Sequence, residues 1–169
     1  MERIDVLKTY KIFIGGKFPR TESGRYFHVK NDNEELLANM CLSSRKDFRN
    51  AVVAARKVQK SWESASALNK GQVLYRIAEM LEGRKSQFMD ELMMSGSSKI
   101  AAKKEVEQSI DRLIYYAGWS DKFQQIFSSV NPVASSHFNF SVPQAMGVVS
   151  VIAPNEFSLL GLVSVVAPV

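Results

Sequence analysis

Apolar residues recur every three or four positions in three segments of the chain, and this spacing predicts three amphipathic helices. The first is expected to begin at Ser44, which forms a capping box with Asp47 three positions later. The second is expected over about residues 69–94 and the third over about residues 100–125. The side chains expected to face the core are those of Phe48, Ala51, Val52, Ala55, Val58, Trp62, Leu74, Ile77, Leu81, Phe88, Leu92, Val106, Ile110, Leu113 and Ala117.

Shorter apolar or alternating runs, bounded by glycine, proline or asparagine, predict strands. The predicted strands cover residues 12–14, 17–18, 26–29, 36–42 and 137–142. Gly15 and Gly16 separate the first two strands and predict a tight hairpin turn between them.

The run Gly147-Val148-Val149-Ser150-Val151-Ile152 lacks polar alternation, so it predicts a strand buried on both faces, as in a parallel sheet. Pro154 ends this strand because it has no N–H, and residues 157–166 continue as an apolar segment of helical length. Strand, turn and helix units bind nucleotides at the carboxyl ends of strands, where helix N-termini offer free N–H groups. The glycine-rich G-x-G-x-x-G fingerprint does not follow the strand, so periodicity alone supports only a buried strand, turn and helix.

Composition is that of a soluble globular protein, with 46% hydrophobic and 23% charged residues. The net charge is +5, but the basic residues alternate with acidic ones along the predicted helices, so we expect no nucleic acid partner. The start of the chain, MERIDVLKTY, is too charged for a secretory signal. Residues 146–169 are long enough to span a membrane, but Glu156 near their middle would be costly in lipid. We therefore expect no membrane partner and a cytoplasmic location.

Few residues offer chemistry by their spacing. Cys41 is the only cysteine, so an internal disulfide is impossible, and its place in an apolar run favours a small core residue. His28 has no second ligand nearby, which argues against a metal site. Glu105 and Glu107 are two residues apart on a helix and do not share a face, so solvated helix residues are the default interpretation.

Five segments, taken in chain order, resemble the aldehyde dehydrogenase superfamily. They are KIFIGGKF (Lys11–Phe18), AVVAARKVQKSW (Ala51–Trp62), VLYRIAEMLEGRKSQF (Val73–Phe88), EVEQSIDRLIYYAGWSDK (Glu105–Lys122) and GVVSVIAPNEFSLL (Gly147–Leu160). The last is similar to the family segment GVVGVIAPWNFPLL, and the YYAGW portion of the fourth is rather specific. The resemblance covers nearly the whole chain.

This resemblance implies an α/β fold that is the N-terminal part of the aldehyde dehydrogenase fold, with N-terminal strands, three helices, a bridging strand and the start of the doubly wound cofactor-binding sheet. It implies that residues 1–126 belong to the cofactor-binding domain. Residues 127–145 would form a bridging segment for homo-oligomers, with the 137–142 strand at the subunit contact. Residues 146–169 would hold the first strand, turn and helix of the NAD-binding sheet.

The family oxidises aldehydes with NAD or NADP, and the resemblance implies the same cofactors and a small aldehyde substrate here. Family enzymes are roughly three times longer, and their catalytic cysteine and general-base glutamate would lie beyond Val169. We therefore expect a fragment of a longer protein that is inactive as this chain alone. The alternative is a non-catalytic, aldehyde dehydrogenase-like scaffold.

At the turn the chain departs from the family. The family sequence is Pro-Trp-Asn-Phe-Pro, and the chain has Pro154-Asn155-Glu156-Phe157-Ser158. The resemblance implies that Ile152, Ala153, Pro154 and Asn155 line the cofactor cleft. The family asparagine donates a hydrogen bond to the oxyanion formed from the aldehyde, and its position is occupied by Glu156. A one-residue slip that gives the donor role to Asn155 is the alternative, which the ungapped match of Pro154 and Phe157 disfavours.

Overall fold

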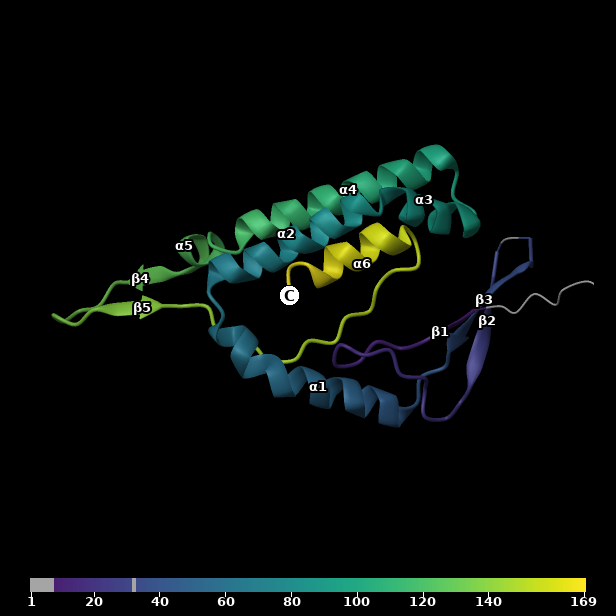
Figure 1. Ribbon diagram of the computed structural model, residues 1–169. Coiled ribbons are helices and arrows are strands. Elements are labelled where there is room, and N and C mark those ends of the chain that lie inside the picture. The colour runs from purple at the N-terminus through teal and green to yellow at the C-terminus, as the bar shows by residue number, and fades with distance from the viewer. Residues whose placement is uncertain (1–7, 32) are drawn as a thin grey trace, which may run out of the picture.

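A computed structural model describes residues 8–31 and 33–169, and its core is a layer of helices packed side by side (Figure 1). The four helices of this layer are α2 (Ala67–Gly83), α3 (Lys85–Met94), α4 (Lys99–Trp119) and α6 (Ser158–Val166). The central helix is α4, which packs against each of the other three. The end of the described chain therefore lies against its middle.

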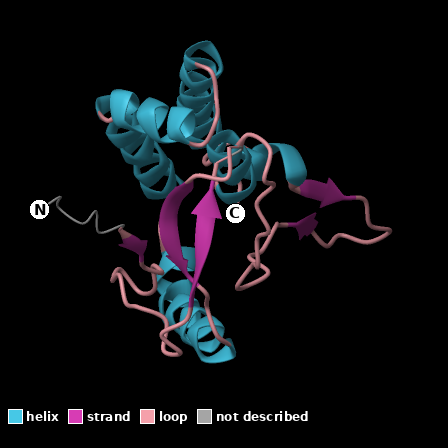
Figure 2. Ribbon diagram, turned by 90° about the vertical axis from the view of Figure 1, so that its right-hand side faces the viewer, coloured by secondary structure: helices cyan, strands magenta, loops and turns pink. Residues whose placement is uncertain are grey.

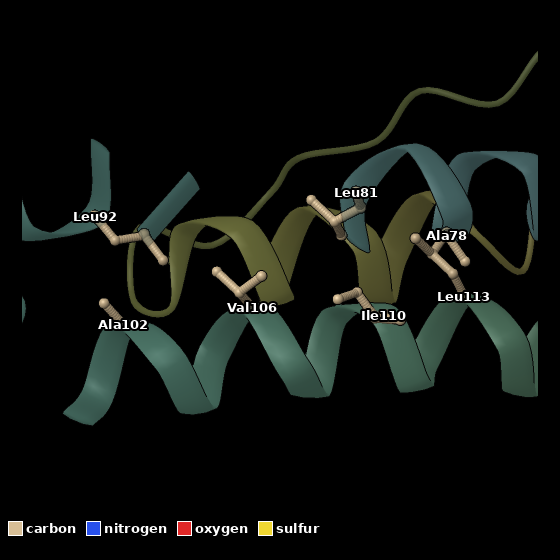
Figure 3. Close-up of a cluster of buried hydrophobic side chains, with 7 residues drawn as sticks. All are labelled: Ala78, Leu81, Leu92, Ala102, Val106, Ile110 and Leu113. Atoms are coloured by element: carbon tan, nitrogen blue, oxygen red, sulfur yellow. The ribbon is translucent and has the colours of Figure 1, made fainter. Parts of the chain in front are cut away.

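The core of the protein lies along one face of α4 (Figure 3). Its buried members are Ala78, Leu81, Leu92, Ala102, Val106, Ile110 and Leu113. From α6, Leu159 and Val163 pack against this cluster and are partly buried. The predicted core face of α4 is confirmed by the burial of Val106, Ile110 and Leu113.

On α2 the predicted core positions Leu74 and Leu81 pack in the core, but the prediction is wrong for Ile77, which is 47% exposed, while its neighbour Ala78 is buried. The reason is the close approach of α2 to α4. A Cβ atom placed on Gly71 would lie 3.0 Å from the carbonyl oxygen of Ala117, so there is no room for a larger side chain at this point of the contact. Gly71 and Ala78 are two helical turns apart and lie on the same face of α2.

The second and the third predicted helices, over about residues 69–94 and 100–125, are each interrupted. The second one breaks at Arg84, whose N–H bonds the carbonyl of Leu81 in a tight turn at 3.2 Å, directly after Gly83, a poor helix former. The third one ends at Trp119, and the short helix α5 (Phe123–Phe127) follows. The apolar spacing continues across both interruptions, so it could not predict them.

Helix α1 (Arg45–Ser64) begins at the predicted capping box. The hydroxyl of Ser44 accepts the N–H of Asp47 at 3.3 Å, and the carboxylate of Asp47 accepts the N–H of Ser44 at 2.8 Å. The prediction of a buried apolar stripe is wrong for the described residues, since Phe48 is 64% and Trp62 is 44% exposed. Figure 1 shows the reason, because α1 stands apart from the helical layer.

A small three-stranded sheet has the order β1, β3, β2, formed by β1 (Thr9–Tyr10), β2 (Tyr26–Lys30) and β3 (Leu36–Cys41). Strands β2 and β3 are antiparallel, as their predicted positions allow, and β1 is parallel to β3. The predicted hairpin of residues 12–18 is reduced to a turn. Ile14 and Lys17 form one isolated bridge around Gly15 and Gly16, whose φ angles are 58° and 76°.

A separate hairpin consists of β4 (Ser129–Asn131) and β5 (Asn139–Ser141), which pair antiparallel. Strand β5 lies within the predicted 137–142 strand. Figure 2 shows this hairpin well away from the three-stranded sheet. Its apolar side chains are exposed, with Phe138 at 73% and Phe140 at 59%.

We expect stability to fall at acid pH because of Asp47. The N–H of Ser44, the hydroxyl of Thr21 and the N–H of Glu22 lower the pKa of Asp47 from 3.8 to about 2. A lowered pKa contributes stability that is complete above pH 3.8 and is lost as the pH falls through about 2. Urea denaturation between pH 7 and pH 2 measures it, and Asp47→Asn should flatten the dependence over this window.

The matched control is Asp90→Asn, because Asp90 is an exposed carboxylate on α3. This variant should keep the wild-type pH dependence. An Asp47→Asn curve that runs parallel to the wild-type curve over the whole range would refute the assignment to Asp47.

Candidate functional site

The run of residues 147–152 is not a strand in the described structure, so the prediction of a buried parallel strand is wrong here. The segment has no ladder partner in either sheet. Val149 is 49% exposed and Ile152 is 92% exposed. A parallel strand needs neighbours on its edges and cover on its faces, and the described residues supply neither to this segment.

The turn that follows leads into α6, as predicted. Ala153 is half-buried, whereas Pro154, Asn155 and Glu156 are exposed. Phe157 is the N-cap residue and has φ 50° and ψ 60°, in the left-handed region. This conformation costs a residue with a Cβ atom roughly 1–2 kcal/mol. Other contacts must therefore hold the turn in place.

One such contact joins Pro154 to Gly161. A Cβ atom on Gly161 would lie 2.5 Å from Cγ of Pro154, so the proline ring occupies the space that any other residue would fill at this position. The N–H of Gly161 also bonds the carbonyl of Phe157 at 2.6 Å. The turn therefore folds back against the first turn of α6.

The second contact comes from α4. One carboxylate oxygen of Glu105, Oε1, accepts the N–H of Leu159 at 2.9 Å and the N–H of Leu160 at 3.3 Å. Glu105 is 6% exposed. The interpretation of Glu105 as a solvated helix residue is therefore wrong.

Glu107 behaves differently, although it is only two positions away. Its carboxylate accepts a hydrogen bond from Nζ of Lys85 at 2.7 Å, and this bond lowers the pKa of Glu107. The spacing of Glu105 from other buried residues could have predicted its burial. Glu105 lies three residues after Ala102 and four before Ser109, on the buried face of α4.

The start of α6 is thus already occupied by an anion. The free N–H groups of a helix N-terminus attract phosphates, but here the carboxylate of Glu105 takes two of them. A cofactor phosphate at this helix end would have to displace a buried carboxylate of the same charge. Of the residues predicted to form the site, Ile152, Pro154, Asn155 and Glu156 are exposed and thus accessible to a ligand, whereas Ala153 is half-buried.

The other candidates lie elsewhere. Cys41 is half-buried at the end of β3. His28 lies on β2, and its Nδ1 is 2.8 Å from Oδ1 of Asn39. In the parts of the chain that the structure describes, no three histidine, cysteine or acidic side chains come close enough to share a metal ion. Within the same residues, no helix has the length and apolar character needed to cross a membrane.

Comparison with known proteins gives consistent matches. Residues 18–169 match the family described as "Aldehyde dehydrogenase family". Retinal dehydrogenase 2 of Gallus gallus is 32% identical over 168 residues, which are 96% of this chain and 32% of that protein. The chain thus spans about one third of the length of this relative.

Solved structures show the same fold. A salicylaldehyde dehydrogenase from Pseudomonas putida G7, complexed with salicylaldehyde, matches with a TM-score of 0.88 and 19% identity over 95% of this chain and 33% of that chain. A betaine aldehyde dehydrogenase variant from Staphylococcus aureus, in complex with NAD+, matches with a TM-score of 0.87 and 20% identity over 96% of this chain and 32% of that chain.

The contact between Pro154 and Gly161 predicts the effect of adding a single methyl group. Gly161→Ala should destabilise the protein by up to about 2 kcal/mol, because overpacking typically costs about 1–3 kcal/mol and alanine gains ~1 kcal/mol over glycine in a helix. Urea denaturation measures the free energy of unfolding. Gly83→Ala is the control, because a Cβ atom there meets nothing within 4 Å. Equal effects of the two substitutions would contradict the prediction.

Proposed function

Because the chain belongs to the aldehyde dehydrogenase family, we propose that it is the N-terminal portion of an NAD(P)-dependent enzyme that oxidises an aldehyde to a carboxylic acid. The observation that carries the proposal is the extent of the family match. It runs from residue 18 to residue 169 and includes the turn and α6. The fold, which is the N-terminal part of the family fold, is consistent with it.

We assign the cofactor contact to Ile152, Ala153, Pro154 and Asn155. Support comes from the exposure of this segment, since Ile152 is 92% exposed and the neighbouring proline and asparagine are also exposed. A structural relative in complex with NAD+ shares the fold. The carboxylate of Glu105 at the start of α6 makes that helix end an unfavourable place for the cofactor phosphates, which leaves the residues before the helix as the contact.

Glu156 takes the place of the family asparagine beside the reacting carbonyl. An ionised carboxylate cannot donate a hydrogen bond, and loss of one oxyanion donor typically costs ~10²–10³ in rate. Two like charges ~4 Å apart also repel by about 4 kcal/mol at an effective dielectric constant near 20, which adds roughly a factor of a thousand. Only a protonated Glu156 could act as a donor, and in that form it would replace the asparagine.

The second candidate function is a non-catalytic scaffold. The observation that favours it is the turn, where three of five residues differ from the family sequence. A scaffold would keep the fold and the subunit surfaces but would not require the cofactor.

We further propose that the chain assembles into homo-oligomers through residues 137–142, in the cytoplasm. The described hairpin has two strands, so each strand keeps an unpaired outer edge that can extend into another sheet. The exposed Phe138 and Phe140 add an apolar surface. The single half-buried Cys41 suits a reducing compartment.

The test of the catalytic proposal is Glu156→Asn in a protein that contains this chain together with the catalytic cysteine and glutamate of the family. Restoring the amide donor should raise kcat by at least ~10²–10³, because it stabilises the oxyanion mainly in the transition state, and removal of the repelling carboxylate adds to this gain. The production of NADH or NADPH with an aldehyde measures kcat. Glu91→Asn is the matched control, because Glu91 is an exposed glutamate on α3, and it should leave kcat unchanged.

The 169-residue chain alone should produce no NADH or NADPH from an aldehyde, whether or not Cys41 is replaced by alanine. Calorimetric titration with NAD and with NADP separates a failure of binding from a failure of chemistry. Absence of binding by the longer protein, with no gain from Glu156→Asn, would favour the scaffold and count against the enzyme.

The oligomer proposal predicts that Phe138→Ser weakens self-association by at least ~10-fold, because a large apolar side chain leaves the contact. Sedimentation equilibrium measures the dissociation constant. Phe18→Ser is the control, since Phe18 is also exposed, at 65%, but lies before β2. Unchanged assembly in Phe138→Ser would place the subunit contact outside the hairpin.

A further inference from the structure

Helix α6 begins without a cap of its own. Its N-cap residue is Phe157, which has no polar side chain, and no side chain of the adjoining turn bonds the first N–H groups. Helices usually satisfy these groups with a serine, threonine, aspartate or asparagine at the N-cap. Here the acceptor is the carboxylate of Glu105, which is 54 residues away from Leu159 in the chain.

The hydrogen bonds of the Glu105 carboxylate are made to α6. The nearby Nζ atoms of Lys85 and Lys103 lie 2.7 Å and 3.9 Å from the carboxylate of Glu107 instead. A buried charge without compensation is strongly unfavourable. For Glu105 the compensation comes from two main-chain N–H groups at the positive end of a helix, which favours negative charge.

The first turn of α6 packs closely against the residues that precede it. Leu159 and Leu160 lie directly after Phe157 and Ser158, and Gly161 joins them to Pro154 by close packing. The strained Phe157 stands between the two anchors. Whatever holds the first turn of α6 against α4 therefore also fixes where the exposed side chain of Glu156 lies.

We propose that Glu105 is a positioning residue for the turn of residues 153–157, and in particular for Glu156. It acts from α4 through the N–H groups of Leu159 and Leu160. The proposal rests on the proposed function only in giving Glu156 a place beside the substrate. Its structural content can be tested in the 169-residue chain without cofactor or aldehyde.

Amide hydrogen exchange followed by NMR gives the test. In Glu105→Ala, the amides of Leu159 and Leu160 should exchange at least ~10-fold faster, since each loses its hydrogen bond to a charged acceptor. The amides of α2 should keep their rates. Glu107→Ala is the control, because its carboxylate contacts Lys85 rather than α6, and it should leave the turn unchanged.

A second variant provides a readout that simple loss of packing would not change. Glu105→Gln keeps the length and one acceptor oxygen, so it should restore most of the slow exchange and the wild-type side-chain carboxyl ¹³C shift of Glu156. Glu105→Ala should change that shift. If Glu105→Ala does not fold, Glu105→Met replaces it, because methionine keeps the length of the side chain without the carboxylate acceptor, and the amides of Leu159 and Leu160 should exchange faster in this variant.

Two results would overturn the proposal. One is an equal acceleration of exchange in α2, α4 and the turn, which would make Glu105 an ordinary core residue. The other is unchanged exchange of the Leu159 and Leu160 amides, with an unchanged Glu156 shift, in Glu105→Ala, or in Glu105→Met where alanine is not tolerated. A loosened turn in a protein that fails to bind NAD or NADP would support the positioning role and count only against the proposed function.

Discussion

The buried face of α4 is the constraint on which the described structure depends. Three helices pack on this one face, and the buried side chains of α4 are small or medium in size, so the helices can approach closely. Apolar burial has no direction and would allow α6 to slide along α4. The carboxylate of Glu105 removes that freedom, because hydrogen bonds require defined distances and angles. Apolar burial thus packs the helices against α4, and the hydrogen bonds of Glu105 set the position of α6 along it.

The sequence predicted the apolar part of this arrangement well, because each turn of α4 contributes an apolar residue to one face. The burial of Glu105 does not follow from its charge, which favours solvent exposure, but the residue lies on the same face of α4 as Ala102 and Val106. On α2 the rule that larger side chains are buried failed at Ile77. Because α2 approaches α4 closely at Gly71, the small residue Ala78 is buried there in place of Ile77. Spacing alone does not show how near a neighbouring helix lies.

For the candidate site, the residue pattern predicted the turn and the helix correctly, but it did not predict that residues 147–152 form no strand. The β-branched run before Ala153 favours burial, yet the pattern does not say which partner would bury it, and among the described residues none does. On α1, the apolar spacing likewise favours burial of Trp62, which is nevertheless exposed among the described residues. The contact of Pro154 with Gly161 was also invisible, because a glycine within a helical run usually lowers the expectation of a helix and does not indicate a partner.

The capping of α6 by a distant residue also bears on the order in which the chain folds. The ribosome makes α4 well before α6, so during synthesis the carboxylate of Glu105 is hydrated and the face around it is incomplete. Its desolvation can occur only when Leu159 and Leu160 arrive from 54 and 55 residues further on. Contacts of such sequence separation form late, since the intervening chain must first be closed into a loop. We therefore expect the turn at Glu156 to be the last part of the helical layer to acquire its conformation, and nascent chains that have not yet completed it to expose the face of α4 to chaperones and proteases.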